Sequence, residues 1–150
     1  MGIEKDIQQK QFRNNYQKAA VNLIFSANWL TEKIKCILDE GDITNQQYNI
    51  LRILRGTTQP LSTLQIRERM LDKMSDTSRI VDRLVKKGLV KKSICQFDKR
   101  LVDISITQAG KSLLEQLDLK NHDIDNLVNK LSDEESSQLS YLLDKMRNHH

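Results

Sequence analysis

The clearest pattern of hydrophobic and polar positions lies between Ser75 and Thr107. From Ser75 onward, polar side chains recur at helical spacing and an apolar stripe occupies the opposite side. The polar positions are Ser75, Ser78, Arg79, Asp82, Arg83 and Lys86, and the apolar stripe consists of Ile80, Val81, Leu84 and Val85. Ser75 is a suitable N-cap, and Gly88 can adopt the left-handed conformation that ends a helix. The pattern predicts a short helix with one buried face and one exposed, basic face.

After Gly88 the period changes to two. Every second residue in 102–106 is apolar and β-branched, which predicts a strand with one buried face, and residues 89–97 are its expected partner. The connecting Asp98-Lys99-Arg100 contains no Asn-Gly or Asp-Gly pair, so we expect a loop longer than two residues. A hairpin tip that carries three charges is suited to reach a phosphate or a minor groove.

Helical periodicity and capping signals predict the elements on either side. Apolar residues keep helical spacing from about Phe12 to Leu38, which predicts a long first helix. Two capping boxes open the next helices, Thr44 with Gln47 and Ser62 with Gln65. The second helix is expected to reach Leu54 or Arg55, and the third to reach about Met70 or Leu71. The third helix and the Ser75 helix meet across a short turn and form a helix-turn-helix.

Past the hairpin, two further helices are expected. Thr107 is positioned to cap a helix interrupted near Asn121, and a capping box at Ser132 and Glu135 opens a final helix. The terminal helices carry more apolar positions than the core of so short a chain needs, which favours dimerisation. A two-fold dimer would place two recognition helices about 34 Å apart, which suits a pseudo-palindromic operator in double-stranded DNA.

The fold class predicted is therefore mainly α with a small β-wing. A winged helix-turn-helix is expected at about 44–107, flanked by N- and C-terminal dimerisation helices at about 1–40 and 108–150, within a single domain. No apolar run exceeds three residues and the first ten residues are polar and charged, so we expect no membrane or secretory segment and a cytoplasmic protein.

The net charge of +4 conceals an asymmetry. Residues 44–107 contain 13 Lys and Arg against 6 Asp and Glu, a net charge of +7, whereas the rest of the chain contains 11 against 14, a net charge of −3. Clustered cations are typical of a phosphate-binding surface, although ordinary surface charge is the alternative.

The chain resembles the MarR family of winged-helix regulators over nearly its whole length. The segments that carry the resemblance are Gln47–Arg55, Gln59–Ser62, Ser78–Val90, Asp98–Arg100 and Ile106–Gly110. The resemblance implies a homodimeric, sequence-specific DNA-binding transcriptional regulator, often a repressor, whose binding is relieved by a small ligand or by cysteine oxidation. It also implies that the N- and C-terminal helices interlock.

We expect the DNA contacts to come from the Ser75 helix and the wing. The helix candidates are Ser75, Thr77, Ser78, Arg79, Arg83 and Lys86, and the wing candidates are Lys91, Lys92, Asp98, Lys99 and Arg100. Arg79 is the foremost candidate because arginine binds a guanine edge through two hydrogen bonds. Asp82 is expected to pair with Lys86 or with a neighbouring arginine, and acceptance of a hydrogen bond from a cytosine amine is the alternative.

The wing residues have separate expected roles. Arg100 resembles the wing arginine that enters the minor groove, with Asp98 orienting it and Lys99 on the DNA backbone. Lys91 and Lys92 are either diffuse phosphate contacts or solubilising charges.

The family resemblance also implies an effector site between the dimerisation helices and the winged part. Candidates for binding a small aromatic or lipophilic effector are Phe25, Asn28, Trp29 and Tyr48, although packing alone can explain these aromatic residues. Cys36 and Cys95 are expected to be buried, inert thiols. A cysteine-based redox sensor is an alternative, but the family's oxidation-sensing cysteine near the start of the first helix has no counterpart here.

An enzyme is the class that the sequence excludes. None of the patterns HExxH, GxGxxG, GxxxxGK[ST] or GxSxG is present, and no cofactor or metal site is expected. A winged-helix module that binds protein instead of DNA is the remaining alternative, because a fold does not determine a function.

Overall fold

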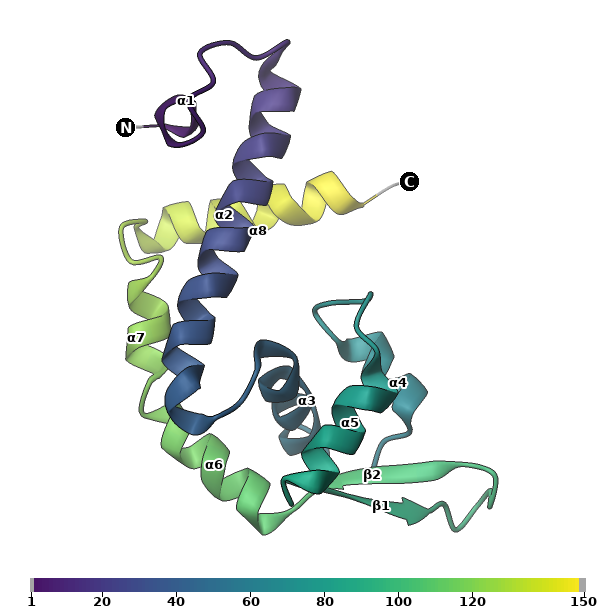
Figure 1. The fold of residues 1–150 in the computed structure, drawn as a ribbon. Coiled ribbons are helices and arrows are strands. Elements are labelled where there is room, and N and C mark those ends of the chain that lie inside the picture. Colours follow the sequence, from purple (N-terminus) through teal and green to yellow (C-terminus); the bar gives the residue numbers. More distant parts are fainter. Residues whose placement is uncertain (1, 149–150) are drawn as a thin grey trace.

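The computed structural model describes residues 2–148, which form a mainly helical chain with a two-stranded antiparallel wing (Figure 1). Met1, His149 and His150, the ends of the predicted terminal arms, lie outside the described residues. The elements are α1 (Ile3–Asp6), α2 (Asn15–Leu38), the 3₁₀ turn η1 (Asp39–Gly41), α3 (Asn45–Arg55), α4 (Thr63–Arg69), α5 (Thr77–Lys86), β1 (Val90–Ile94), β2 (Val102–Ile106), α6 (Gln108–Asp118), α7 (Asn121–Asn126) and α8 (Asp133–Arg147). Within residues 2–148, no helix is both long and apolar enough to cross a membrane.

The hydrophobic core lies beneath α3, α4, α5 and the strands of the winged part, residues 43–107, and is completed by Leu38 of α2 and by Leu114 and Leu117 of α6. Its fully buried members include Ile50, Leu51, Ile66, Val81, Leu84 and Ile104. The capping boxes predicted for α3 and α4 are present. The side chains of Thr44 and Ser62 each accept from the backbone amide of the glutamine three residues on, and the side-chain oxygen of that glutamine accepts from the backbone amide of Thr44 or Ser62. Leu61 forms an antiparallel bridge with Ile104, which ties the segment before α4 to the wing.

The wing is shorter than the sequence pattern predicts. β1 pairs with β2 from Val90 opposite Ile106 to Ile94 opposite Val102, so the partner strand expected over residues 89–97 ends early. Beyond Ile94 the chain turns back at Asp98, whose carbonyl accepts from the Leu101 amide at 3.0 Å. The expected long loop is confirmed, and it spans residues 95–101.

The long first helix begins later than predicted. Asn14 caps α2 by accepting from the Gln17 amide at 2.9 Å, so the helix starts at Asn15 and not at Phe12. The short helix α1, whose Ile3 is buried, has no counterpart among the predicted elements. The predicted end at Leu38, the cap at Thr107, the interruption before Asn121 and the capping box of α8 are all confirmed.

Two joints connect the winged part to the terminal helices. At the C-terminal joint, Thr107 donates to the Gly88 carbonyl at 2.7 Å, and a Cβ on Gly110 would lie 2.3 Å from the carbonyl oxygen of Leu89. Only glycine fits there. At the N-terminal joint, which we call the elbow (residues 39–44), the chain passes from η1 to α3 through Asp42 in the left-handed region at φ 51°.

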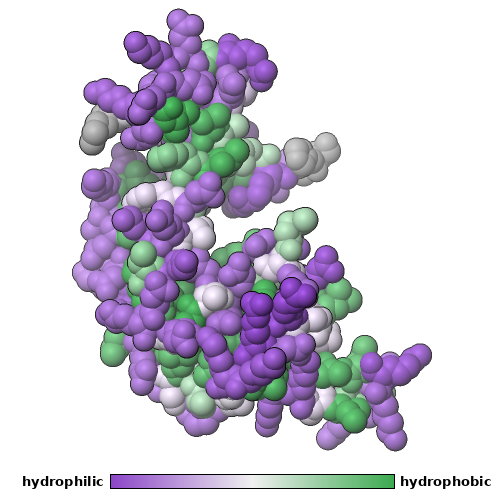
Figure 2. All heavy atoms as spheres, in the orientation of Figure 1, coloured by the Kyte–Doolittle hydropathy of each residue, from purple (hydrophilic) through white to green (hydrophobic). Residues whose placement is uncertain are grey.

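The terminal helices leave apolar side chains uncovered. In Figure 2 hydrophobic side chains gather on the upper part of the molecule, around the helices that Figure 1 labels α2 and α8. Exposed apolar residues on these two helices are Tyr16, Ile24, Phe25, Trp29, Leu139, Tyr141, Leu142 and Met146. We call this set the arm surface. Nothing within residues 2–148 covers it.

Candidate nucleic-acid interface

The N-terminus of α5 differs from the prediction. Asp76, and not Ser75, is the N-cap, because its carboxylate accepts from the Arg79 amide at 3.2 Å. Ser75 lies before the helix and its buried hydroxyl has no hydrogen-bond partner in the described chain. Thr77 begins the helix and is only 4% exposed, so its expected role as a DNA contact does not fit this geometry. The remaining candidates on α5 start at Ser78.

The outward face of α5 is basic. Ser78, Arg79, Arg83 and Lys86 are all exposed, as the helical pattern predicts. Arg79 lies 3.8 Å from the Asp76 carboxylate and keeps most of its surface exposed, whereas Arg83 and Lys86 form no salt bridge within residues 2–148. Val85, assigned to the buried stripe, lies partly exposed beside this face, while Val81 and Leu84 hold the helix on the core. Gly88 ends the helix at φ 73°, as predicted.

Asp82 has a different partner from the one expected. Its carboxylate pairs with Lys92 of β1, and not with Lys86 on its own helix. Lys92 was expected to be a phosphate contact or a solubilising charge, but its ammonium group ties the wing to the recognition helix. The pair also neutralises the one carboxylate on the outward face of α5, which leaves that face more favourable for an anionic partner.

The wing tip presents Arg100 and Lys99 to solvent. Arg100 donates to both carboxylate oxygens of Asp98, at 3.2 and 3.3 Å, and its backbone amide donates to the same residue at 3.0 Å. These contacts hold the pKa of the Asp98 carboxyl below its usual value, the side-chain bond from Arg100 being the larger cause. The expected orienting contact between Asp98 and Arg100 is therefore present. Lys91, the other wing lysine, is also exposed.

The end of the wing also carries an exposed apolar group that the sequence analysis did not select. Ile94, Phe97, Leu101 and Val102 are exposed, and the Phe97 ring is 98% accessible. Alternation along β2 places Val102 on the same face as the buried Ile104, in agreement with the predicted phase. Val102 is nevertheless uncovered, because the wing extends beyond the core. A local pattern cannot indicate that overhang.

A cavity of about 510 Å³ lies between the first long helix and the winged part. Its lining includes Thr31 and Ile34 of α2, Tyr48 and Arg52 of α3, and Ile124 of α7. The Arg52 guanidinium lies over the Tyr48 ring, 5.6 Å from its centre. Of the four effector candidates, Tyr48 lines this cavity, whereas Phe25, Asn28 and Trp29 are exposed and do not.

The cysteines are less buried than expected. Cys36 is exposed on α2, so the expectation of a buried thiol on the apolar side of that helix is wrong for the single chain. Cys95 is partly buried at the start of the wing loop. Helical periodicity placed Leu38 correctly on the buried side of α2, but it also placed Cys36 on that side, where the structure has it exposed.

Comparison with known proteins agrees with this architecture. The model of the MarR family matches residues 43–102, the segment from α3 to the first residue of β2. An uncharacterised HTH-type transcriptional regulator from Bacillus cereus is 31% identical over 75% of this chain and 75% of its own.

Two similar solved structures contain DNA. A MarR variant from E. coli, in complex with operator DNA, is 26% identical and has a TM-score of 0.79, with 92% of this chain and all of that chain covered. MepR from S. aureus, in a complex with DNA, is 25% identical and has a TM-score of 0.76, with 91% and 97% covered. The predicted resemblance and fold class are confirmed. The chain belongs to the MarR family, whose fold and members are those of transcription regulators and not of enzymes.

Proposed function

We propose that the protein is a homodimeric, sequence-specific DNA-binding transcription regulator that represses genes near a pseudo-palindromic operator. The observation that carries the proposal is the pairing of two basic, exposed elements in the winged part. Arg79, Arg83 and Lys86 lie on the outward face of α5, and Arg100 lies at the wing tip. A helix of this kind fits a major groove, and an arginine on a projecting hairpin fits a minor groove.

The comparisons support DNA as the partner, because the similar E. coli and S. aureus proteins were solved with DNA bound. In our proposal Arg79 and Arg83 contact base edges, Ser78 and Lys86 contact the edges or the phosphates, and Lys91 and Lys99 contact phosphates. Thr77 and Ser75 are left out because of their burial. Such a function requires the compartment that contains the DNA, which for the bacterial relatives is the cytoplasm.

The arm surface supports the homodimer. Apolar side chains on α2 and α8 lie uncovered at the end of the molecule away from the wing (Figures 1 and 2). A second copy related by a two-fold axis would cover this set with the same set, and would present two recognition helices to successive turns of DNA.

Salt-dependent binding tests the DNA partner. Duplex fragments selected from genomic DNA would be titrated with the protein at several salt concentrations, together with Arg79→Ala, Arg100→Ala and the control Lys130→Ala, an exposed lysine between α7 and α8. We expect affinity to fall steeply as salt rises, and each arginine variant to bind about tenfold more weakly. Affinity that is insensitive to salt and to both arginine changes would favour a protein-binding module instead.

The cavity beside Tyr48 supports relief of repression by a small ligand. It lies between α2, which carries part of the arm surface, and α3 of the winged part, so an occupant would contact both regions. Its lining combines apolar side chains with Arg52 and Asp72, which suits a small aromatic or lipophilic molecule that carries a polar group.

A screen for compounds that release bound operator DNA tests this site and the sign of regulation. A compound that acts through the cavity should lose potency in Arg52→Met, while DNA affinity without the compound stays unchanged. In a reporter strain, loss of the regulator should raise transcription from the selected operator. A fall in transcription would identify an activator.

A further inference from the structure

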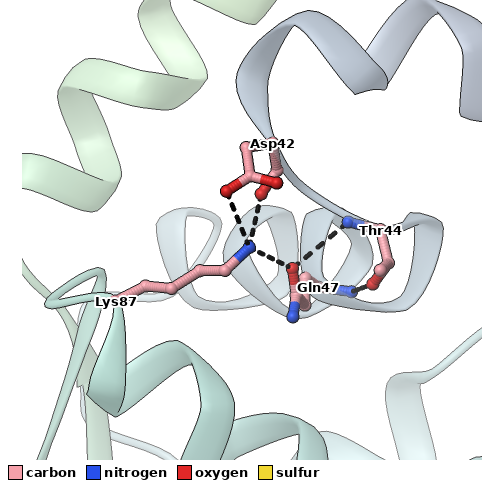
Figure 3. Close-up of polar contacts among 4 residues, drawn as sticks. All are labelled: Asp42, Thr44, Gln47 and Lys87. Carbon is pink, nitrogen blue, oxygen red and sulfur yellow. Dashed lines mark hydrogen bonds and ion pairs between the residues drawn. The ribbon is translucent and has the colours of Figure 1, made fainter.

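The residue after the recognition helix makes a contact that its place in the sequence does not suggest. Lys87 follows the last residue of α5, and its ammonium group reaches back to the elbow (Figure 3). There it donates to the backbone carbonyl of Asp42 and to the side-chain oxygen of Gln47, the latter at 3.2 Å. We call this set of contacts the latch.

The Gln47 end of the latch is held in place by other bonds. Gln47 is only 4% exposed, and its side-chain Oε1 atom also accepts from the backbone amide of Thr44 at 3.2 Å. The backbone amide of Gln47 in turn donates to the Thr44 hydroxyl at 3.1 Å. Lys87 therefore bonds to an oxygen that the capping box of α3 has already fixed, so the Gln47 side chain loses little further freedom when the bond forms.

The Asp42 end of the latch depends on the backbone. The carboxylate of Asp42 is fully exposed and lies 3.9 Å from the Lys87 ammonium, a separation at which a surface ion pair contributes little. The carbonyl of Asp42 is the closer acceptor, and its direction is set by the left-handed conformation of that residue. Lys87 thus joins the end of α5 to the point where the chain leaves the arm helix α2 and enters α3.

We propose that Lys87 is a positioning residue for DNA recognition, which acts by fixing the angle between the recognition helix and α2. This inference rests on the proposed function. Because α5 is a rigid helix, any movement of its C-terminal end changes the direction of Ser78, Arg79 and Arg83 together. In a dimer that is joined through α2, the same angle sets the separation of the two recognition helices.

A phosphate contact is the other role that a lysine at this position could have, and the geometry disfavours it. The ammonium group of Lys87 is directed at the elbow and engages two acceptors there, and the side chain is only one-third exposed. Lys86, its neighbour, is exposed and forms no salt bridge within the described residues. The two adjacent lysines should therefore respond differently to the same substitution.

Operators with altered half-site spacing test the proposal. The wild-type protein, Lys87→Met and Lys86→Met would be titrated with the selected operator and with versions lengthened or shortened by one base pair, at several salt concentrations. We expect Lys87→Met to bind the best operator on the order of three- to tenfold more weakly, to lose most of the preference for spacing, and to keep the wild-type salt slope. Lys86→Met should keep the preference and lower the slope by about 0.9 for each lost phosphate contact.

Two further variants act as controls. Lys87→Arg keeps the charge and the hydrogen-bond donors, so it should restore the preference for spacing. Asp42→Asn removes the carboxylate while it keeps a residue that tolerates the left-handed conformation, so it should behave as wild type. An Asp42→Asn variant as defective as Lys87→Met would overturn the assignment of the carbonyl as the acceptor that matters.

Hydrogen exchange in the DNA-free protein gives a readout that is independent of DNA. The amides of the elbow and of the α3 capping box, above all that of Thr44, should exchange faster in Lys87→Met than in wild type. Unchanged exchange, or a lowered salt slope with an intact preference for spacing, would overturn the latch. A wild-type protein that shows no salt-dependent DNA binding would refute the proposed function, and the exchange data would then still decide whether Lys87 holds the elbow.

Discussion

The winged part and the terminal helices use their apolar residues in opposite ways. Leu84 of α5 and Ile104 of β2 are completely buried by their own chain, whereas Ile24 of α2 is 63% exposed and Leu142 of α8 is 50% exposed. Apolar residues recur at helical spacing in both regions. The described chain leaves these apolar side chains of α2 and α8 uncovered, which supports the dimer proposed above.

Charge divides the two regions in the same way. The net charge of +7 lies in residues 44–107 and the net charge of −3 in the rest. Like charges in the winged part would repel a second winged part, while a polyanion would attract both. The contrast agrees with a molecule that contacts itself through one region and DNA through the other.

The largest effect should come from a cavity in the winged core. Leu84→Ala is expected to lower the free energy of unfolding by about 2–5 kcal/mol, because the side chain is fully buried and the surrounding core cannot close the space. Leu142→Ala should cost far less at low protein concentration and should matter more as concentration rises. Urea unfolding at two protein concentrations measures both. Equal costs that do not depend on concentration would remove the distinction between the regions.

A charge placed on the arm surface should separate the dimer. Ile24→Glu would bury an unpaired carboxylate in the proposed interface, so the dissociation constant of the dimer should rise at least roughly tenfold. Thr58→Glu, at an exposed polar position of the winged part, is the matched control. Sedimentation over a range of concentrations gives the result, and a folded wild-type monomer at micromolar concentration would contradict the dimer.

A smaller effect should follow from the ion pair that joins the two regions. Arg55 of α3 donates to both carboxylate oxygens of Asp118 in α6, at 2.7 and 3.1 Å, and this contact raises the pKa of the Arg55 guanidinium. Both side chains are more than one-third exposed, so we expect a coupling of only about 0.5 kcal/mol. A double-mutant cycle with Arg55→Met and Asp118→Asn measures it. A coupling near zero would show that the contact is not maintained in solution.

The smallest predicted change is the titration of Asp98 at the wing tip. Its pKa is lowered by Arg100, so the stabilisation it gives to the loop is present at neutral pH and is lost as pH falls through that lowered pKa. Carboxyl-carbon NMR should show the Asp98 pKa below its usual value, and Arg100→Met should raise that pKa toward the usual value, because only the backbone amide contact remains. Identical titrations in the two proteins would mean that the wing-tip contact does not form in solution.

Local signals in the sequence were sufficient for most elements. Helix ends depend on residues within about four positions, so the sequence pattern alone identifies them. Examples are the capping boxes at Thr44 and Ser62 and the left-handed Gly88. The long wing loop followed from the absence of a turn pair in the same way.

The errors share a physical cause. Asp82 pairs with Lys92 ten residues away, and Lys87 bonds to Gln47 forty residues away, so neither contact has a local pattern. Threonine is a polar residue that is usually exposed, but Thr77 is buried where α5 begins. Periodicity indicates which face of a helix is apolar, but it does not indicate how much of that face the neighbouring elements cover.

The fit around Gly110 makes the two joints mechanically unequal. α6 starts against the carbonyl of Leu89 with no room for a side chain, so α6 cannot shift toward the start of the wing without a clash. The elbow has no such backbone contact. Its Gly41 packs against the side chains of Leu113 and Leu117 in α6, its Ile43 is buried in the core, and Lys87 and Lys120 bond to it from outside, Lys120 to Glu40 at 2.9 Å. In the dimer proposed above, a displacement of α6 should therefore displace the wing as well.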